Sequence, residues 1–99
     1  MKLSKGKTAR GFALIEFTDY YNKKCSIQKS SIATQDMIWM GIDDPTPEIM
    51  AQHTTQGGIG WVPFYIPKEV SIHTRMHLTK DQAWSIIKVL IKFVITGNI

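Results

Sequence analysis

The sequence has a single cysteine, Cys25, among its 99 residues. One thiol excludes an internal disulfide, and without a Cys-x-x-Cys pair there is no zinc-ribbon or thioredoxin-like motif. Long apolar runs are also missing near the start, where the run that begins at Gly11 already ends at Glu16. That run is too short for the apolar core of a signal peptide. We therefore expect one small domain in a reducing compartment.

Acidic residues are scarce relative to basic ones, and the net charge is +4. The excess lies in residues 1–10, where Lys2, Lys5, Lys7 and Arg10 have no acidic neighbour; the rest of the chain is balanced. We predict a flexible basic tail over residues 1–10 and a single domain over residues 11–99. The tail is either a solvated terminus or a weak, salt-dependent contact for nucleic acid.

A long helix is predicted from Thr79 to Thr96. Thr79 and Gln82 have the spacing of a capping box, and Asp81 is favourable near the positive end of a helix. Gly97 supplies a residue that tolerates the left-handed conformation at which helices commonly end. The start and the end of this helix are therefore both marked in the sequence.

The apolar surface of this predicted helix covers roughly half of its circumference. It is made of Ala83, Trp84, Ile86, Ile87, Leu90, Ile91, Phe93, Val94 and Ile95. A small sheet covers a narrower arc, so either another loop or a second copy of the chain packs here. We predict a homo-oligomer through the C-terminal helix. No membrane span is expected, because Lys88 and Lys92 interrupt an apolar stretch shorter than the roughly 20 residues needed.

Alternating apolar and polar residues predict β-strands in the rest of the chain. The predicted strands are Gly11–Thr18, Lys24–Ser30, Met37–Ile42 and Val70–Leu78. Gly60–Ile66 is an edge strand or a lid, because Pro63 cannot donate to a central ladder. Residues 31–36 fit a turn, a short helix or a bend. The predicted fold is α+β, with a small antiparallel sheet of about four or five strands packed by a long C-terminal helix.

Polar side chains alternate outward on two of the predicted strands. Arg75 would hold an anion, with His73 or His77 adding a hydrogen bond, and the amide of Gln28 would bind a base or ribose. Trp61, Phe64 or Tyr65 would stack on the ligand from the lid. The candidate ligand-binding residues are Ser26, Gln28, Ser30, Trp61, Tyr65, His73, Arg75 and His77. An ordinary solvated sheet face is the alternative.

The sequence predicts no catalytic group, metal or cofactor. His73 and His77 are four strand residues apart, roughly 13 Å, and so do not bind one ion. Cys25 is predicted to point inward and His77 outward, so they do not form a nucleophile and base pair. We therefore expect a protein that is not an enzyme.

Two blocks of the sequence carry a resemblance to known proteins. One is Cys25-Ser26-x-Gln28-x-Ser30-Ser31, and the other is Arg75-Met76-His77-Leu78; Gly60-Trp61-Val62-Pro63 lies between them. With these motifs the chain resembles small proteins of undefined function encoded by tailed phages and prophages. The resemblance spans about four fifths of the chain. One departure is Asn22, where such sequences tend to have Gly. The resemblance implies an accessory protein in the cytoplasm of the bacterial host.

The leading hypothesis is a non-enzymatic, oligomeric phage protein that binds a small phosphate-bearing, nucleotide-like ligand. Such a protein would sequester a nucleotide signal of bacterial antiviral immunity, which is a counter-defence function. One alternative is an inhibitor that binds a host defence protein through Trp61–Tyr65. The other is nucleic-acid binding through residues 1–10.

Overall fold

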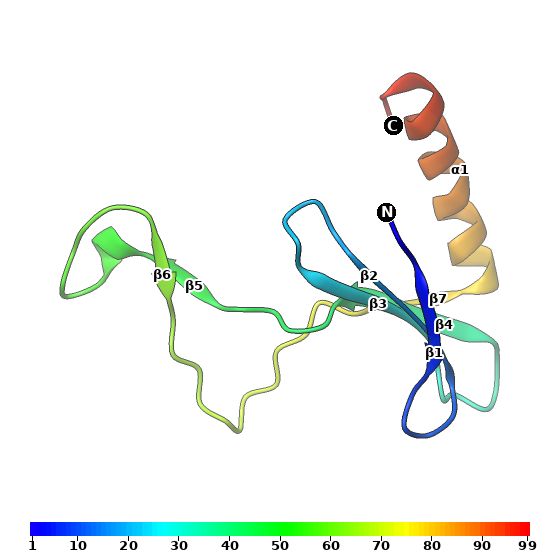
Figure 1. Ribbon diagram of the computed structural model, residues 1–99, viewed down its shortest axis with the longest axis horizontal. Helices are drawn as coiled ribbons and strands as arrows, with labels where there is room; N and C mark the ends of the chain where they lie inside the picture. The colour runs from blue at the N-terminus through cyan, green and yellow to red at the C-terminus, as the bar shows by residue number, and fades with distance from the viewer.

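The computed structural model describes residues 1–99 and consists of a sheet, a projecting arm and one long helix (Figure 1). Five strands form an antiparallel sheet in the order β1-β2-β3-β4-β7. They are β1 (Ser4–Lys7), β2 (Ala13–Thr18), β3 (Lys24–Lys29), β4 (Met37–Ile42) and β7 (Met76–Thr79), and α1 (Lys80–Thr96) follows β7 directly. The predicted α+β class and antiparallel sheet are confirmed.

The helix signals read from the sequence are confirmed. Thr79 is the N-cap, its side chain accepts from the backbone of Gln82, and the Gln82 side chain accepts from the backbone of Thr79. At the other end Gly97 has φ 77° and donates its N–H to the carbonyl of Phe93 at 2.8 Å. No helix here combines the length and apolar content needed to cross a membrane.

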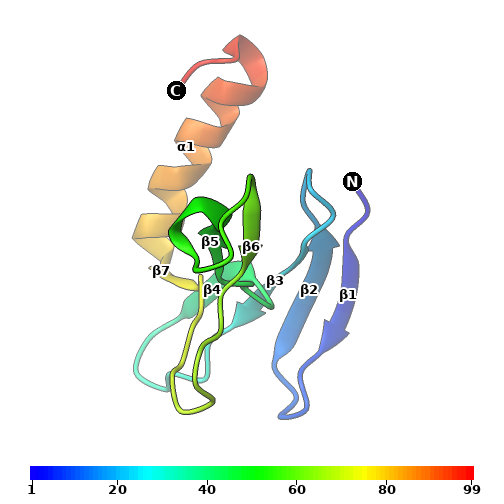
Figure 2. The same cartoon turned by 90° about the vertical axis from the view of Figure 1, so that its left-hand side faces the viewer.

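The helix contacts the sheet mainly through β7, and it rises from that edge instead of lying flat on the sheet (Figures 1 and 2). Ala83 and Ile86 are half-buried, whereas every residue from Ile87 to the end of α1 is exposed. The apolar surface predicted for the helix is therefore uncovered along most of its length.

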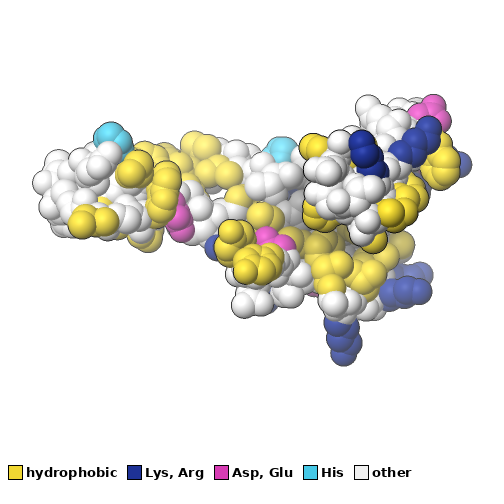
Figure 3. Space-filling view, turned by 90° about the horizontal axis from the view of Figure 1, so that it is seen from above, with side chains coloured by type: hydrophobic (Ala, Val, Ile, Leu, Met, Phe, Trp, Pro, Cys, Tyr) yellow, Lys and Arg dark blue, Asp and Glu magenta, His cyan; other side chains and the backbone are white.

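The segment from Asp43 to His73, here called the arm, projects from the sheet (Figure 1). It contains a separate two-stranded sheet, β5 (Glu48–Met50) with β6 (Trp61–Pro63), and a 3₁₀ turn over Ala51–His53. In the space-filling view, hydrophobic side chains are spread over the arm as well as the body (Figure 3). The predicted edge strand or lid is β6, shorter than expected and located on the arm.

Little of the chain is buried. The radius of gyration is 17.3 Å, against about 13 Å for a compact chain of this size. Five residues are buried: Cys25, Ser26, Ser30, Ala51 and Leu78. A single copy therefore lacks the packed core that usually stabilises a domain.

The basic N-terminal segment differs from the predicted flexible tail. Ser4–Lys7 pairs with Ala13–Glu16 as an edge strand of the sheet. The connecting turn is closed by Thr8, whose hydroxyl accepts from Phe12 N–H at 3.0 Å, and Gly11 adopts φ 86°. The lysines of this segment thus lie on an exposed sheet edge, where charge discourages pairing with further strands.

The other connections between strands agree with the sequence predictions to different degrees. The hairpin turn between β2 and β3 has Asn22 at φ 62°, as predicted from the tolerance of Asn for this region. Residues 31–36 form a bend. The prediction of a strand over Val70–Leu78 is wrong before Met76, because at Thr74 a side chain replaces the backbone in bonding to Ile42.

Candidate functional site

Three of the predicted ligand-binding residues, Gln28, Arg75 and His77, lie around Trp39. Gln28 pairs with Trp39 across β3 and β4, and Trp39 pairs with His77 across β4 and β7. The side chains of Gln28, Trp39 and His77 therefore lie on one face of the sheet. The guanidinium carbon of Arg75 lies 4.4 Å from the Trp39 ring centroid. The centroids of the His77 and Trp39 rings are 6.5 Å apart.

A hollow of about 330 Å³, here called the Trp39 hollow, opens on this part of the surface. Its lining residues come from the β1–β2 turn, β3, the β3–β4 bend, β4 and the segment before β7. They are Thr8, Ala9, Arg10, Phe12, Gln28, Lys29, Ser31, Trp39 and Arg75. No carboxylate is among them, so the hollow has a basic lining with two aromatic rings.

The arginines carry the charge that a ligand in this hollow would meet. The guanidinium of Arg10 lies 5.6 Å from the centroid of the Phe12 ring, so each arginine is placed over an aromatic ring. Neither arginine forms an ion pair with a carboxylate, whereas Lys29 donates to Asp36 at 2.9 Å. Because guanidinium stays charged and presents paired donors, Arg10 and Arg75 suit a phosphate or carboxylate.

Two predicted ligand residues are buried: Ser26 on β3 and Ser30 directly after it. Ser26 is 1% exposed, and its hydroxyl donates to the carboxylate of Asp43. Ser30 is 6% exposed, and its hydroxyl oxygen accepts from the Ile32 N–H at 3.3 Å. The prediction that these hydroxyls are exposed to a ligand is wrong, because both are buried and hydrogen-bonded to the segments that follow β4 and β3.

The remaining predicted residues lie on the arm. Trp61 is 65% exposed, Tyr65 is 81% exposed and His73 is also exposed. None of them lines the Trp39 hollow. The predicted lid therefore does not stand over this hollow, and His73 leaves the strand face that it was expected to share with Arg75 and His77.

Sequence reasoning missed Trp39, Arg10 and Phe12. Trp39 lies in the run Met37–Ile42, which predicts a strand but gives no reason to separate its two faces. The register that places Trp39 opposite Gln28 has no local signal, because the conformation of residues 31–36, which sets it, is not fixed by the sequence pattern. Arg10 belongs to the predicted flexible tail, and only the turn that returns the chain into β2 brings it to the hollow.

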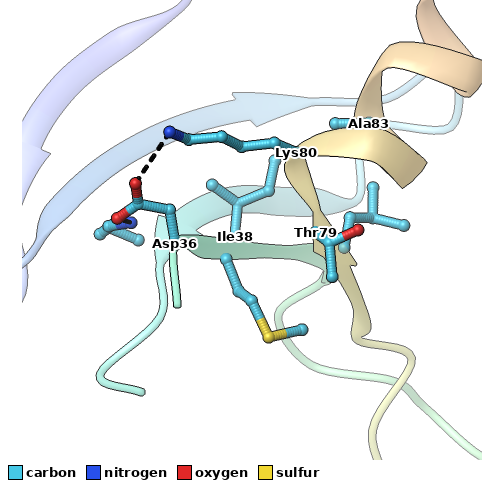
Figure 4. Close-up of a pocket in the computed structure, with 8 residues that line it drawn as sticks. Asp36, Ile38, Thr79, Lys80 and Ala83 are labelled. Carbon is cyan, nitrogen blue, oxygen red and sulfur yellow. Dashed lines mark hydrogen bonds and ion pairs between the residues drawn. The ribbon is translucent and has the colours of Figure 1, made fainter. Parts of the chain in front are cut away.

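A second hollow, of about 310 Å³, lies between the β3–β4 bend and the start of α1. Figure 4 shows Asp36 from the β3–β4 bend and Lys80 from the start of α1, both lining this hollow. The carboxylate of Asp36 accepts from Lys29 at 2.9 Å and from Lys80 at 3.0 Å. These hydrogen bonds, together with the two positive charges, lower the pKa of Asp36 to about 2. Because its lysines already hold an internal carboxylate, this hollow is a poor site for a phosphate.

The other reactive groups do not assemble into a site. No three His, Cys, Asp or Glu side chains are close enough to hold a metal ion. Cys25 is 6% exposed, and burial raises the pKa of its thiol, with the carboxylates of Asp19 and Asp43 adding to the effect. The thiol is thus kept in its protonated, unreactive form near neutral pH.

No family model, curated protein or solved structure matches the chain.

Proposed function

We propose that this protein is a non-enzymatic phage accessory protein that binds a small phosphate-bearing ligand in the Trp39 hollow. The observation that supports this proposal is the pair of arginines, Arg10 and Arg75, in a lining without carboxylates. A site of this composition attracts anions, and neither arginine is bonded to an internal carboxylate.

The hollow has the size and the chemistry for a small nucleotide-like molecule. Its volume of about 330 Å³ is at the lower end of ordinary small-molecule sites, which run from about 300 to 1,000 Å³. Arg75 would bind a phosphate in the bidentate mode, and the Gln28 amide can both donate to and accept from a base or ribose. The ring of Phe12 or Trp39 adds an apolar surface for the rest of the ligand.

The protein acts as a homo-oligomer in this proposal, assembled through α1. Ile87, Leu90, Ile91, Val94 and Ile95 form an exposed apolar surface on α1 that contains no polar residue. Leaving such a surface in water is costly, and a second α1 offers a matching apolar surface. Oligomerisation would also supply the core that one chain lacks.

The biological role that we propose is sequestration of a nucleotide immune signal in the cytoplasm of the bacterial host. Sequestration requires tight binding without turnover, and the Trp39 hollow supplies anion-binding groups, while the buried Cys25 thiol lies outside its lining. The phage context comes from the resemblance carried by the Cys-Ser-x-Gln-x-Ser-Ser and Arg-Met-His-Leu motifs.

The test is native mass spectrometry of the protein purified from infected cells, followed by titration with a panel of cyclic and linear nucleotides. We expect an oligomer that retains a nucleotide, and weaker binding in Arg75→Ala than in Lys68→Ala, which removes a charge from the arm. An oligomer that binds no member of the panel, with Arg75→Ala indistinguishable from the unmodified protein, would rule the proposal out.

One observation favours a second candidate function, inhibition of a host defence protein by direct binding. The arm projects from the body and exposes Trp61 and Tyr65, and aromatic residues of this kind are enriched in protein interfaces. A single stoichiometric host protein that is captured by the unmodified chain and lost with Trp61→Ala would support this function. Capture that survives Trp61→Ala and Tyr65→Ala would contradict it.

A further inference from the structure

Thr74 makes an unusual connection where the arm returns to the sheet. Its hydroxyl accepts from the N–H of Ile42 at 2.8 Å and donates to the carbonyl of Ile42 at 3.1 Å. Extending the pairing of Met40 with Met76 by two residues places Thr74 opposite Ile42. The Thr74 hydroxyl therefore replaces the two backbone hydrogen bonds that a ladder partner would make, and it satisfies both the N–H and the carbonyl of Ile42.

Gly41 makes this connection possible. A Cβ atom at Gly41 would lie 2.8 Å from the Thr74 carbonyl oxygen and 3.0 Å from its Oγ1. Real Cβ atoms essentially never come within 3.0 Å of a backbone atom, so any side chain at this position would displace the Thr74 backbone. The returning chain thus crosses over Gly41, on the sheet face that also carries Trp39 two residues earlier.

Arg75 lies between two fixed points as a result. The residue before it is held by the Thr74 hydroxyl, and the residue after it is held by the ladder pair of Met76 with Met40. Both points are anchored on β4, the strand that carries Trp39. The backbone that presents the Arg75 guanidinium is therefore fixed relative to the ring on which it lies.

We propose that Thr74 and Gly41 are positioning residues for Arg75. Neither lines the Trp39 hollow. By fixing the chain on both sides of Arg75, they keep its guanidinium over Trp39 and lower the conformational entropy lost when an anion binds. This inference rests on the proposed function of the hollow, and it assigns to Thr74 and Gly41 a part in ligand affinity in addition to their part in the fold.

The test is an NMR titration with inorganic phosphate, at constant ionic strength, that follows the Arg75 side-chain resonance and, in every variant including those that lack Arg75, the indole N–H resonance of Trp39. Thr74→Val keeps the shape of the residue and removes the hydroxyl, whereas Thr74→Ser keeps the hydroxyl. We expect Thr74→Val to weaken phosphate binding roughly three- to tenfold, as is usual for neighbouring groups that share one interaction. Thr74→Ser should bind within about twofold of the unmodified protein.

A double-mutant cycle separates positioning from general destabilisation. In an Arg75→Ala background, Thr74→Val should cause no further loss of phosphate affinity, because the group that it positions is gone. Gly41→Ala reaches the same crossing without removing the hydroxyl, and it should weaken binding in the same Arg75-dependent way. It also serves as the test if Thr74→Val does not fold.

The outcomes distinguish this inference from the proposed function. Phosphate that produces no saturable shift of the Arg75 resonance in the unmodified protein would overturn the proposed function and this inference with it. Saturable binding that depends on Arg75 but is unchanged by Thr74→Val and Gly41→Ala would overturn the inference alone. Equal losses with and without Arg75 would also overturn it.

Discussion

The guanidinium of Arg75 and the ring of Trp39 form the closest cation–aromatic contact in the molecule, at 4.4 Å from carbon to ring centroid. The contacts of Arg10 with Phe12 and of Lys88 with Trp84 are longer, at 5.6 and 5.5 Å. Contacts of this kind contribute about 0.5–2 kcal/mol, depending on exposure. The Arg75 contact leaves the guanidinium without a carboxylate partner, so its donors remain available to an anion.

The role of Arg10 can be tested by charge removal. Arg10→Gln should weaken the binding of inorganic phosphate about three- to tenfold, because a charge-assisted hydrogen bond contributes more than a neutral one. The measurement is a calorimetric or NMR titration. Lys68→Gln on the arm is the matched control for loss of one positive charge, and it should have little effect. Equal losses in both variants would indicate attraction by net charge, without a site at Arg10.

The apolar surface of α1 can be tested by adding a charge. Leu90→Glu should dissociate the oligomer or weaken it at least tenfold, since a carboxylate would have to lose its water in the helix interface. Sedimentation over a range of concentrations gives the oligomeric state. Ser85→Glu, on the polar side of the same helix, should assemble normally. An unmodified protein that stays monomeric at every concentration would contradict the prediction.

The ion pairs of Asp36 should make stability depend on acid pH. The pKa of this carboxyl is about 2 in the folded chain, against about 3.9 for an unperturbed Asp. A lowered pKa stabilises the fold above the unfolded value, so this contribution is complete above roughly pH 5 and is lost as the pH falls toward 2. Denaturant unfolding at several pH values measures it.

Asp36→Asn is the control for this pH dependence. The variant should be less stable than the unmodified protein at neutral pH, because Lys29 and Lys80 lose their common partner. The difference should shrink as the pH falls from about 5 to 2, where the native carboxyl also takes up its proton in about half of the molecules. A difference that stays constant over this range would show that the pKa is not lowered in the folded chain.

Cys25 should react slowly in the folded protein. Its thiol is 6% exposed, and its pKa is raised mainly by burial, so both access and thiolate formation are limited. Alkylation by iodoacetamide near neutral pH should be at least about tenfold slower in the native protein than in denaturant. Equal rates in the two conditions would mean that the β3 strand opens readily.

Local signals were sufficient for the elements whose residues interact with near neighbours in sequence. The capping box of Thr79 with Gln82 and the stop at Gly97 depend on contacts within one helical turn. The strand Met37–Ile42 and the turn at Asn22 were predicted for similar local reasons. The α+β class followed from these elements.

The site needed information that a linear pattern does not contain. Alternation along Lys24–Ser30 placed Ser26 outward, but the pattern cannot show that Asp43 would accept from its hydroxyl. Alternation along Val70–Leu78 likewise cannot show that Gly41 leaves room for the chain to cross the sheet at Thr74. Both interactions join residues more than fifteen positions apart.

The sequence by itself determined the helix, most of the strands and the excess of apolar surface on α1, because propensity, capping and periodicity act over a few residues. The tertiary structure decided which polar residues meet. It brought Arg10, Gln28 and Arg75 to Trp39, it buried Ser26 against Asp43, and it placed His73 on the arm. The reason is physical. Strand register and the close approach at Gly41 depend on contacts between distant segments, and these contacts form only when the whole sheet is assembled.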